Sequence, residues 1–226
     1  MKKISNNILL NKYIDKHNIK SIFEDNILKY AQLHYYEKNE TILQADCELT
    51  YYYLFVDGKI KISYLLENGK SILLQFYTNF DSLGDLELLN NIPVRCNAEA
   101  IENTYLIGLP ANILRSSYCN NPKFLKHIIN SLSRKLDATG NNSSYNLVYP
   151  LINRLSSYIV EHITDKDYIQ LNSSFKEIAQ FLGTTYRHLN RTFNTLESKG
   201  IIKCDDKIIY ILQKEELRKL SKNLYI

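Results

Sequence analysis

The stretch from Ser173 to Ile202 constrains the fold most strongly, because it predicts two short amphipathic helices joined by a glycine turn. Ser173 or Ser174 supplies an N-cap oxygen, and Gly183 supplies the positive φ that a sharp turn requires. The apolar residues on either side recur at helical spacing and are Phe175, Ile178, Ala179 and Leu182, then Tyr186, Leu189, Phe193 and Leu196. We therefore expect a helix-turn-helix.

The second helix of this stretch carries hydrogen-bond donors opposite its apolar stripe. These outward residues are Thr184, Arg187, His188, Arg191 and Asn194. Gly200 then ends the helix, and the β-prone runs Ile201–Cys204 and Ile208–Ile211 predict a hairpin wing. In such folds the N-terminal half of the second helix enters the DNA major groove. The alternative is a helical hairpin packed into another domain, with both arginines simply solvated.

A region from about Leu49 to Leu109 is rich in β-prone residues and is divided by turn signals. Asn68-Gly69 is a strong hairpin signal. On the strand before it, Ile60, Ile62 and Tyr64 alternate with Lys59, Lys61 and Ser63. On the strand after it, every second residue is again apolar: Ile72, Leu74 and Phe76. Short strands at this spacing predict a barrel or a jelly roll.

A long helix is predicted to begin at Pro122 and to carry a heptad seam. The seam residues are Leu125, Ile129, Leu132, Leu136, Thr139, Ser143 and Asn146. The first half of the seam is apolar enough to pair two chains, although a helix packed on its own barrel also explains it. The stretch Asp137–Ser144 is polar, and Gly140 costs roughly 1 kcal/mol of helix stability relative to Ala. We expect the helix to be weakest there.

Pro150 begins another helix, with Leu151, Leu155, Tyr158, Ile159 and His162 on one face. Glu215–Lys222 forms a terminal helix that is expected to pack on the helix-turn-helix. The predicted fold class is therefore α+β. It comprises a β-roll effector domain (1–118), a dimerisation helix (119–148) and a winged helix-turn-helix (149–226).

Composition narrows the function further. From Val148 onward the chain has 12 Lys and Arg against 9 Asp and Glu, a weakly basic balance that suits a phosphate backbone. The N-terminus has no uninterrupted apolar segment and no run is long enough to span a membrane, so we expect a cytoplasmic protein with reduced cysteines and no membrane partner. Leu49–Leu109 contains no histidine, and no hydrolase or P-loop motif occurs, so we expect no enzyme and no metal site.

The order of roll, seam helix and winged helix-turn-helix resembles the CRP/FNR family of bacterial transcription regulators. Leu54–Pro110 is similar to that family's effector roll, and Lys176–Ile202 follows its helix-turn-helix pattern, with a Tyr-Arg-His-Leu-Asn-Arg string like that of the YeiL-like branch. The resemblance implies a homodimer that reads a pseudo-palindromic operator in double-stranded DNA, with RNA polymerase as a candidate partner and with DNA affinity set by a signal sensed in the roll. The competing function is a ligand-binding module whose C-terminal domain contacts a protein.

The resemblance also implies an effector site. Its residues are Gly84, Asp85, Leu86, Arg95, Cys96 and Thr139. Asp85 and Arg95 correspond to the family's ribose and phosphate contacts, which makes a cyclic nucleotide or another small anion the implied ligand. Asp85 is shorter than the usual Glu, Cys96 replaces a hydroxyl, and Gly140 replaces a second hydroxyl. Alternatively, Asp85 and Arg95 pair with each other, or Cys96 is a redox thiol with a lowered pKa. No iron–sulfur cluster or haem is expected, because the first cysteine is Cys47 and no histidine stands in a ligand motif.

For DNA, the resemblance places the base-reading positions on Tyr186, Arg187 and Arg191. An Arg binds guanine O6 and N7, whereas the family's usual Glu at the second position accepts from cytosine, so the half-site preference should differ. The remaining predicted contacts position the protein on phosphates or flank the reading residues, and they are Ser174, Thr184, Thr185, His188 and Lys199.

Overall fold

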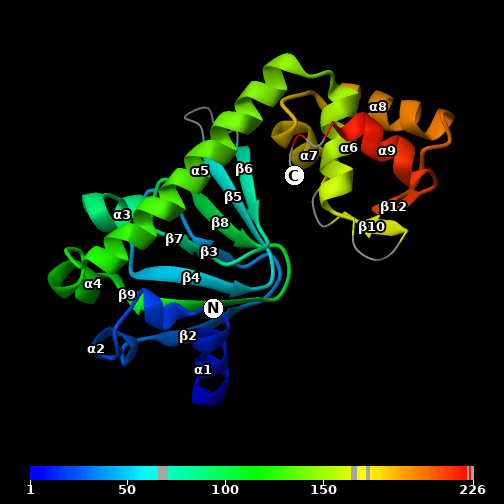
Figure 1. Cartoon of the computed structure of the whole chain (residues 1–226). Helices are drawn as coiled ribbons and strands as arrows, with labels where there is room; N and C mark the ends of the chain where they lie inside the picture. The colour runs from blue at the N-terminus through cyan, green and yellow to red at the C-terminus, as the bar shows by residue number, and fades with distance from the viewer. Residues whose placement is uncertain (66–70, 164–166, 172–173, 223, 225–226) are drawn as a thin grey trace. The chain divides into compact units, whose positions relative to one another are not determined.

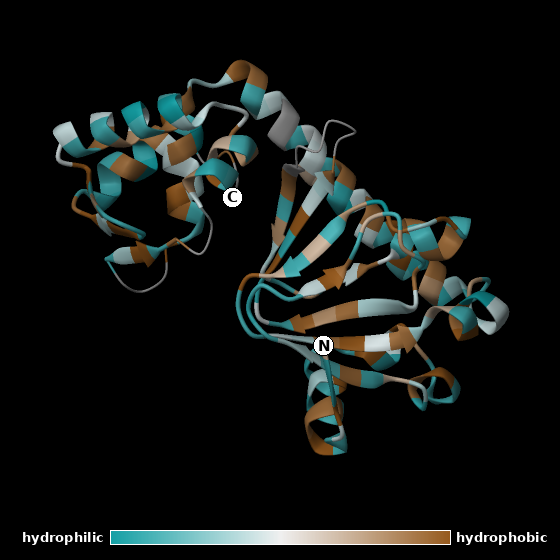
Figure 2. Ribbon diagram, turned by 180° about the vertical axis from the view of Figure 1, so that it is seen from behind, coloured by the Kyte–Doolittle hydropathy of each residue, from teal (hydrophilic) through white to brown (hydrophobic). Residues whose placement is uncertain are grey.

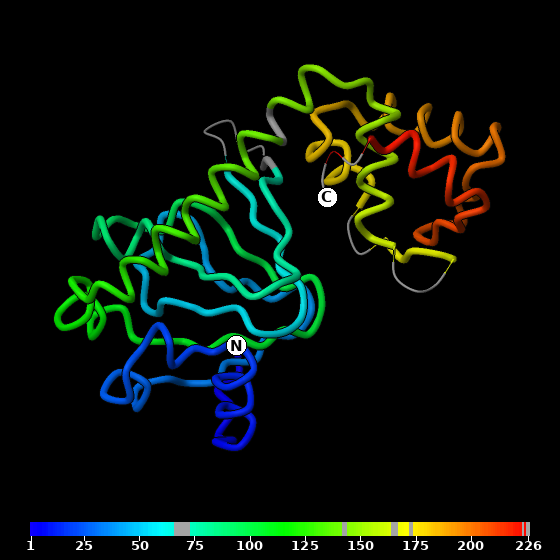
Figure 3. The backbone as a smooth tube through the Cα atoms, viewed as in Figure 1, coloured from blue at the N-terminus to red at the C-terminus, as the bar shows by residue number. Residues whose placement is uncertain are grey.

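The computed structural model describes residues 1–65, 71–163, 167–171, 174–222 and 224. It divides into two compact units, Met1–Asp137 and Ala138–Ile226. The division falls within helix α5 (Pro122–Val148), at the beginning of the stretch expected to be weak, although the helix is continuous through that stretch. Figure 3 traces the chain from the blue and green first unit to the yellow and red second unit. The three predicted domain ranges stay a prediction.

The first unit is a roll of two antiparallel sheets, as predicted (Figure 1). One sheet has the order β1-β2-β9-β4-β7, and the other has the order β3-β8-β5-β6. The strands are β1 (Lys2–Ile4), β2 (Gln32–Tyr36), β3 (Thr41–Leu43), β4 (Tyr51–Asp57), β5 (Ile60–Leu65), β6 (Ser71–Tyr77), β7 (Asp81–Leu83), β8 (Asn97–Ala100) and β9 (Thr104–Pro110). The first three precede the predicted β-region. The predicted Asn68-Gly69 turn lies outside the described residues, but β5 and β6 on either side of it pair antiparallel.

Apolar side chains from both sheets form the interior of the roll. Figure 2 colours the hydrophobic residues along the strands brown. The predicted alternation holds for Ile60 and Ile62, but Lys59, which was expected in water, is buried as well. The pairing of β5 with β6 shifts register between Ile62 and Ser63 and leaves Leu74 of β6 as the extra residue; beyond this point Ser63 is buried and Tyr64 is 39% exposed. On β6 the buried residues are accordingly Leu73 and Tyr77, and Leu74 and Phe76 are only partly buried.

The outer face of the five-stranded sheet packs against helices of the same unit. These helices are α1 (Asn7–Lys16), η1 (Ile19–Ser21), α2 (Asp25–Leu28), α4 (Ala111–Ser117) and the first half of α5, and α3 (Asp85–Asn90) follows β7. Asn121 accepts hydrogen bonds from the first amides of α5, which begins at Pro122 as predicted. Phe124 and Ile128 of α5 are fully buried against the roll, whereas Ile129 and Leu136 on another face are 62% and 73% exposed.

The second unit is a winged helix-turn-helix, as predicted. Its elements after α5 are α6 (Leu151–Glu161), β10 (Tyr168–Gln170), α7 (Phe175–Phe181), α8 (Tyr186–Ser198), β11 (Ile202–Asp205), β12 (Ile208–Ile211) and α9 (Lys214–Ser221). Gly183 and Gly200 have the expected positive φ, of 58° and 66°. β10 extends the wing to three strands, which was not predicted. Helix α9 packs mainly on α6 and not, as predicted, on the helix-turn-helix: Leu217 is buried, and Asn153 of α6 donates to the Leu220 carbonyl at 2.8 Å. None of the helices in the described ranges is long and apolar enough to cross a membrane.

His34 makes the stability of the first unit dependent on pH. The imidazole is 1% exposed and contacts the Tyr53 hydroxyl and Gln32 Oε1, and burial, followed by the charges of Lys3 and the N-terminus, lowers its pKa to about 4. An unfolded His titrates near pH 6.5, so between about pH 6.5 and pH 4 the unfolded chain binds the additional proton. We expect His34 to remove about 1–3 kcal/mol of unfolding free energy as the pH falls through this window.

Urea denaturation of the wild type and of His34→Gln at pH 7.5, 6 and 5 measures this contribution. The variant should lose less stability than the wild type on acidification. Equal losses in both proteins would show that His34 is not the group responsible.

Candidate effector cassette and nucleic-acid interface

Helix α8 presents a cationic edge above a buried stripe. Leu189, Phe193 and Leu196 are at most 3% exposed, so this face is fixed in the core of the second unit. Arg187 and Arg191 are exposed, and neither forms an ion pair with a residue of the described ranges. Tyr186 was expected in the buried stripe but is 49% exposed, because it is the first residue of the helix and lies beside the turn. The exposed edge therefore combines an aromatic ring with two guanidinium groups.

Hydroxyl groups fix where the two helices begin. Ser174 caps α7 in a capping box with Glu177, accepting from the Glu177 amide at 3.3 Å. Thr185 caps α8 by accepting from the His188 amide at 3.2 Å. Thr184 lies 3.3 Å from His188 Nδ1. Two of the predicted phosphate contacts, Ser174 and Thr185, are thus also capping residues, and they fix the position of the exposed edge of α8.

A buried guanidinium that was not predicted connects α5, α6 and the helix-turn-helix turn. Arg154 is 7% exposed and donates from Nε to the Tyr149 carbonyl at 3.0 Å. Its Nη1 donates to Asn146 Oδ1 at 2.8 Å and also to the Leu182 carbonyl at the end of α7. The Asn146 side chain in turn packs 3.0 Å from the position that a Cβ of Gly183 would occupy. The turn before α8 is therefore held to the last turns of α5.

Replacing Arg154 with Met should lower the unfolding free energy of the second unit by about 1–3 kcal/mol, because buried acceptors lose their donor. Denaturant unfolding followed by circular dichroism measures the change. Arg218 on α9 is the matched control, since its side chain is 53% exposed and its ion pair with Glu215 is 3.6 Å long. Arg218→Met should cost less than about 0.5 kcal/mol. Similar losses for both variants would contradict the structural role of Arg154.

The roll part of the predicted effector site, called the cassette below, comprises Gly84, Asp85, Leu86, Arg95 and Cys96 and begins where β7 ends. Gly84 has a φ of 95°, and a Cβ there would come within 2.8 Å of Leu49, so the position requires glycine. The Asp85 carboxylate that follows is 3% exposed, whereas Leu86 is 46% exposed. The turn thus directs Asp85 inward and Leu86 outward.

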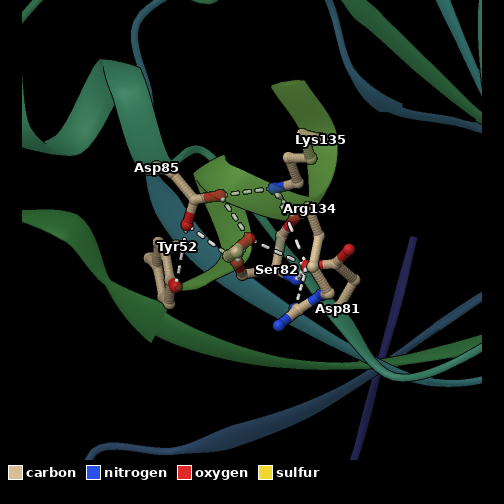
Figure 4. Close-up of polar contacts among 7 residues, drawn as sticks. Tyr52, Asp81, Ser82, Asp85, Arg134 and Lys135 are labelled. Carbon is tan, nitrogen blue, oxygen red and sulfur yellow. Dashed lines mark hydrogen bonds and ion pairs between the residues drawn. The ribbon is translucent and has the colours of Figure 1, made fainter. Parts of the chain in front are cut away.

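The Asp85 carboxylate is surrounded by donors from the protein (Figure 4). Oδ1 accepts from the hydroxyl groups of Tyr52 at 3.0 Å and Ser82 at 2.7 Å. Oδ2 accepts from Lys135 on α5, and the Ser131 hydroxyl lies 3.1 Å away. Burial opposes ionisation, but the Lys135 charge and these hydrogen bonds outweigh it and hold the pKa of Asp85 below its usual range.

This arrangement does not fit the cyclic nucleotide that the resemblance implies. A carboxylate has about four acceptor sites, and four protein groups lie within hydrogen-bond distance of those of Asp85. A ribose hydroxyl would therefore have to displace a protein donor. Thr139, the implied purine contact, belongs to the second unit and is exposed.

The second half of the cassette is held by a carboxylate of its own. Glu87 is 8% exposed, and its Oε1 accepts from the Arg95 amide at 2.9 Å. The Arg95 side chain is exposed and forms no ion pair within the described ranges, so the suggested Asp85–Arg95 pair is wrong; Asp85 pairs with Lys135. The suggested low thiol pKa of Cys96 is also wrong, because burial and then the Glu87 charge raise the pKa.

Lys135 and Ser131 are the cassette residues that sequence reasoning missed. Both continue the buried face of α5 in steps of three and four residues from Phe124 and Ile128. That spacing was a usable signal, but the predicted seam covered only the neighbouring face. A lysine on a helix is ordinarily solvated, so its burial against Asp85 depends on how α5 packs.

A β-roll in which protein groups occupy the Asp85 carboxylate, followed by a winged helix-turn-helix, defines a class of regulators with a sensor domain and a DNA-binding domain. The family model described as Cyclic nucleotide-binding domain matches residues 33–118, and the one described as Crp-like helix-turn-helix domain matches residues 153–220. Among solved structures, a transcriptional regulator of the Crp/Fnr family from Eubacterium rectale has a TM-score of 0.78 at 17% identity, covering 93% of this chain and 99% of that one. A CRP-family regulator from Thermus thermophilus has a TM-score of 0.71 at 20% identity, covering 84% and 96%.

Curated relatives agree with this class. Regulatory protein YeiL of Escherichia coli O157:H7 is 22% identical over 202 residues, or 89% of this chain and 91% of that protein. A CRP-like cAMP-activated global transcriptional regulator of Mycobacterium tuberculosis is 21% identical over 178 residues, or 75% and 79%. The chain belongs to the CRP/FNR family of bacterial transcription regulators and is a DNA-binding regulator of this type. The alternative of a C-terminal domain that contacts only a protein is not favoured.

Proposed function

We propose that two copies of this chain pair through α5 and insert the N-terminal edges of their α8 helices into successive major grooves of a pseudo-palindromic operator. The single observation that carries this is the cationic edge of Arg187 and Arg191, which is free of ion pairs within the described ranges and is mounted on a fully buried stripe. Half-sites would lie about 34 Å apart. Tyr186 contacts base edges together with the two arginines. The phosphate contacts are Ser174, Thr185 and Lys199, and Thr184 and His188 flank the reading residues.

The regulatory part of the proposal is that a signal sensed in the roll changes operator affinity through α5. This helix supplies Lys135 to the cassette in the first unit and Asn146 to the Arg154 contact in the second unit. Gly84, Asp85, Leu86, Arg95 and Cys96 then form the roll side of this coupling, and Thr139 lies on the helix between the two contacts. The protein acts in the cytoplasm, has no catalytic role, and has RNA polymerase as a candidate partner.

Replacing Arg187 with Ala should cost about 1–3 kcal/mol of operator binding and relax the preference at one base pair of each half-site. Lys199→Ala should instead weaken binding to all sequences alike, because Lys199 is an exposed cation at the C-terminal end of α8. Competitive gel shift against the gene's own upstream DNA, with one base pair varied at a time, separates the two effects.

Uniform weakening by both variants would remove Arg187 from the base-reading role. No sequence-selective, salt-sensitive retardation of upstream DNA in any condition would instead favour the competing function, a regulatory module that contacts a protein partner.

A further inference from the structure

The roll contains a cavity that is separate from the cassette. Its volume is about 260 Å³, and it lies beside β3 and the start of β4. Ile42, Leu43 and Val94 supply apolar walls, and the rings of Tyr51 and Tyr53 supply aromatic ones. Typical ligand pockets have volumes of about 300–1,000 Å³, so an occupant of this cavity would be small.

The charge of the lining excludes an anion. Among the described residues, the lining includes no Lys, Arg or His side chain. The N-terminal amine of Met1 is there, but it is already paired with Glu40 at 2.9 Å, and the carboxylate of Glu48 lies at the rim. His34 contacts Tyr53 at 3.2 Å, and its lowered pKa keeps it uncharged near neutral pH. A phosphate or carboxylate would meet Glu48 without a free cation in the wall.

The aromatic wall is rigidly built. The Tyr51 and Tyr53 rings lie 5.9 Å apart, and the His34 ring lies edge-on to Tyr51 at 4.8 Å. The Tyr53 hydroxyl lies 2.8 Å from that of Tyr36 and is held from the other side by His34. Ring pairs at these distances attract each other beyond the effect of the area they bury, so a further aromatic ring would be favoured against this wall.

We propose that this cavity binds a small uncharged aromatic molecule, of the size of phenol or indole. Its segment is tied directly to the cassette: the Val94 amide donates to the Cys47 carbonyl at 2.9 Å, and the Asp46 amide donates to the Val94 carbonyl at 2.8 Å. Leu49, between the rim residues Glu48 and Thr50, packs on Gly84. An occupant would therefore displace Val94, which precedes Arg95, and Leu49, which packs on Gly84 next to Asp85. Only this regulatory consequence rests on the proposed function; the binding itself does not.

Calorimetric titration of the full chain in the absence of DNA tests the proposal, with phenol and indole as probes, benzoate as an anion of the same size, and cyclic AMP as a probe of the cassette. Thr50→Trp at the rim should obstruct the cavity. Thr41→Trp is the matched control, because Thr41 is an exposed threonine of β3 outside the lining. Gln44→Trp is a second obstructing variant, in case Thr50→Trp does not fold.

We expect phenol or indole to bind the wild type and Thr41→Trp with a dissociation constant of about 1 mM or tighter, and to bind the obstructed variants about tenfold or more weakly. Benzoate should bind the wild type about tenfold or more weakly than phenol. Absence of phenol and indole binding, equal binding by Thr41→Trp and the obstructed variants, or benzoate binding as tight as that of phenol would overturn the proposal. Phenol binding that cyclic AMP displaces and that Asp85→Asn abolishes would overturn it too, because the ligand site would then be the cassette. Because no DNA is present, failure here leaves operator binding untouched.

Discussion

A chain carrying Ile129→Asp and Leu136→Asp should be monomeric and should bind the operator about 10²- to 10⁴-fold more weakly than the wild type. Both side chains are largely exposed in the single chain, so the substitutions leave its own core intact. In a pair of chains they would place carboxylates in the apolar seam, where an unpaired charge is costly. Each half-site would then be bound by a separate monomer, without the gain in affinity that comes from linking two DNA-binding domains.

Sedimentation equilibrium gives the subunit state, and gel shift gives the affinity. Asn130→Asp is the matched control, because position 130 is exposed on α5 and lies about 100° around the helix from Ile129. This variant should remain paired and bind DNA normally. A double variant that stays dimeric, or a wild-type chain that is monomeric under all conditions, would refute pairing through α5.

Lys135→Met should lower the unfolding free energy of the first unit by about 3–5 kcal/mol. The reason is that Asp85, which is 3% exposed, would keep its charge and lose its cation. The loss should be largest near neutral pH and should shrink as the pH falls, because the pKa of Asp85 would rise without Lys135 and the carboxyl would protonate in the folded variant. Urea unfolding at pH 7.5 and pH 5 measures both features.

Two further variants distinguish the loss of the buried Asp85–Lys135 pair from the loss of any positive charge on this helix. Arg134→Met removes the neighbouring cation, which is 56% exposed and lies 3.3 Å from Asp81, and should cost about 0–1 kcal/mol. Asp85→Asn combined with Lys135→Met should recover most of the loss, since no uncompensated charge remains. If Lys135→Met lowers the free energy of unfolding no more than Arg134→Met does, the Asp85–Lys135 pair does not stabilise the cassette more than an exposed ion pair.

The sequence predicted the second unit almost element by element because its signals are local. A capping serine, a glycine of positive φ and an apolar stripe act within a few residues, so each can be recognised without tertiary information. The placement of α9 failed because it depends on Asn153, which lies 67 residues from its partner Leu220. Distant partners leave no local pattern.

The roll was predicted as a class but not in all its strands. In β2, Leu33, His34 and Tyr36 are all buried, so the strand shows no alternation that could be detected. On β5 the buried face changes after Ile62, where the pairing with β6 shifts by one residue, which no period-two pattern anticipates. The resemblance placed Asp85 in the cassette, but its partner Lys135 comes from 50 residues away, on a face of α5 that only packing defines.

Helix α5 carries Lys135 and Leu136 side by side in sequence, and a helix separates such neighbours by about 100°. Lys135 faces Asp85 and Leu136 faces solvent, so a rotation of the helix about its axis moves both side chains together. A twist that withdraws the ammonium group from its carboxylate swings the leucine away from any partner by the same angle. In the proposed pair of chains, opening the roll and loosening the pairing would therefore be one motion, and a change in one would change the other.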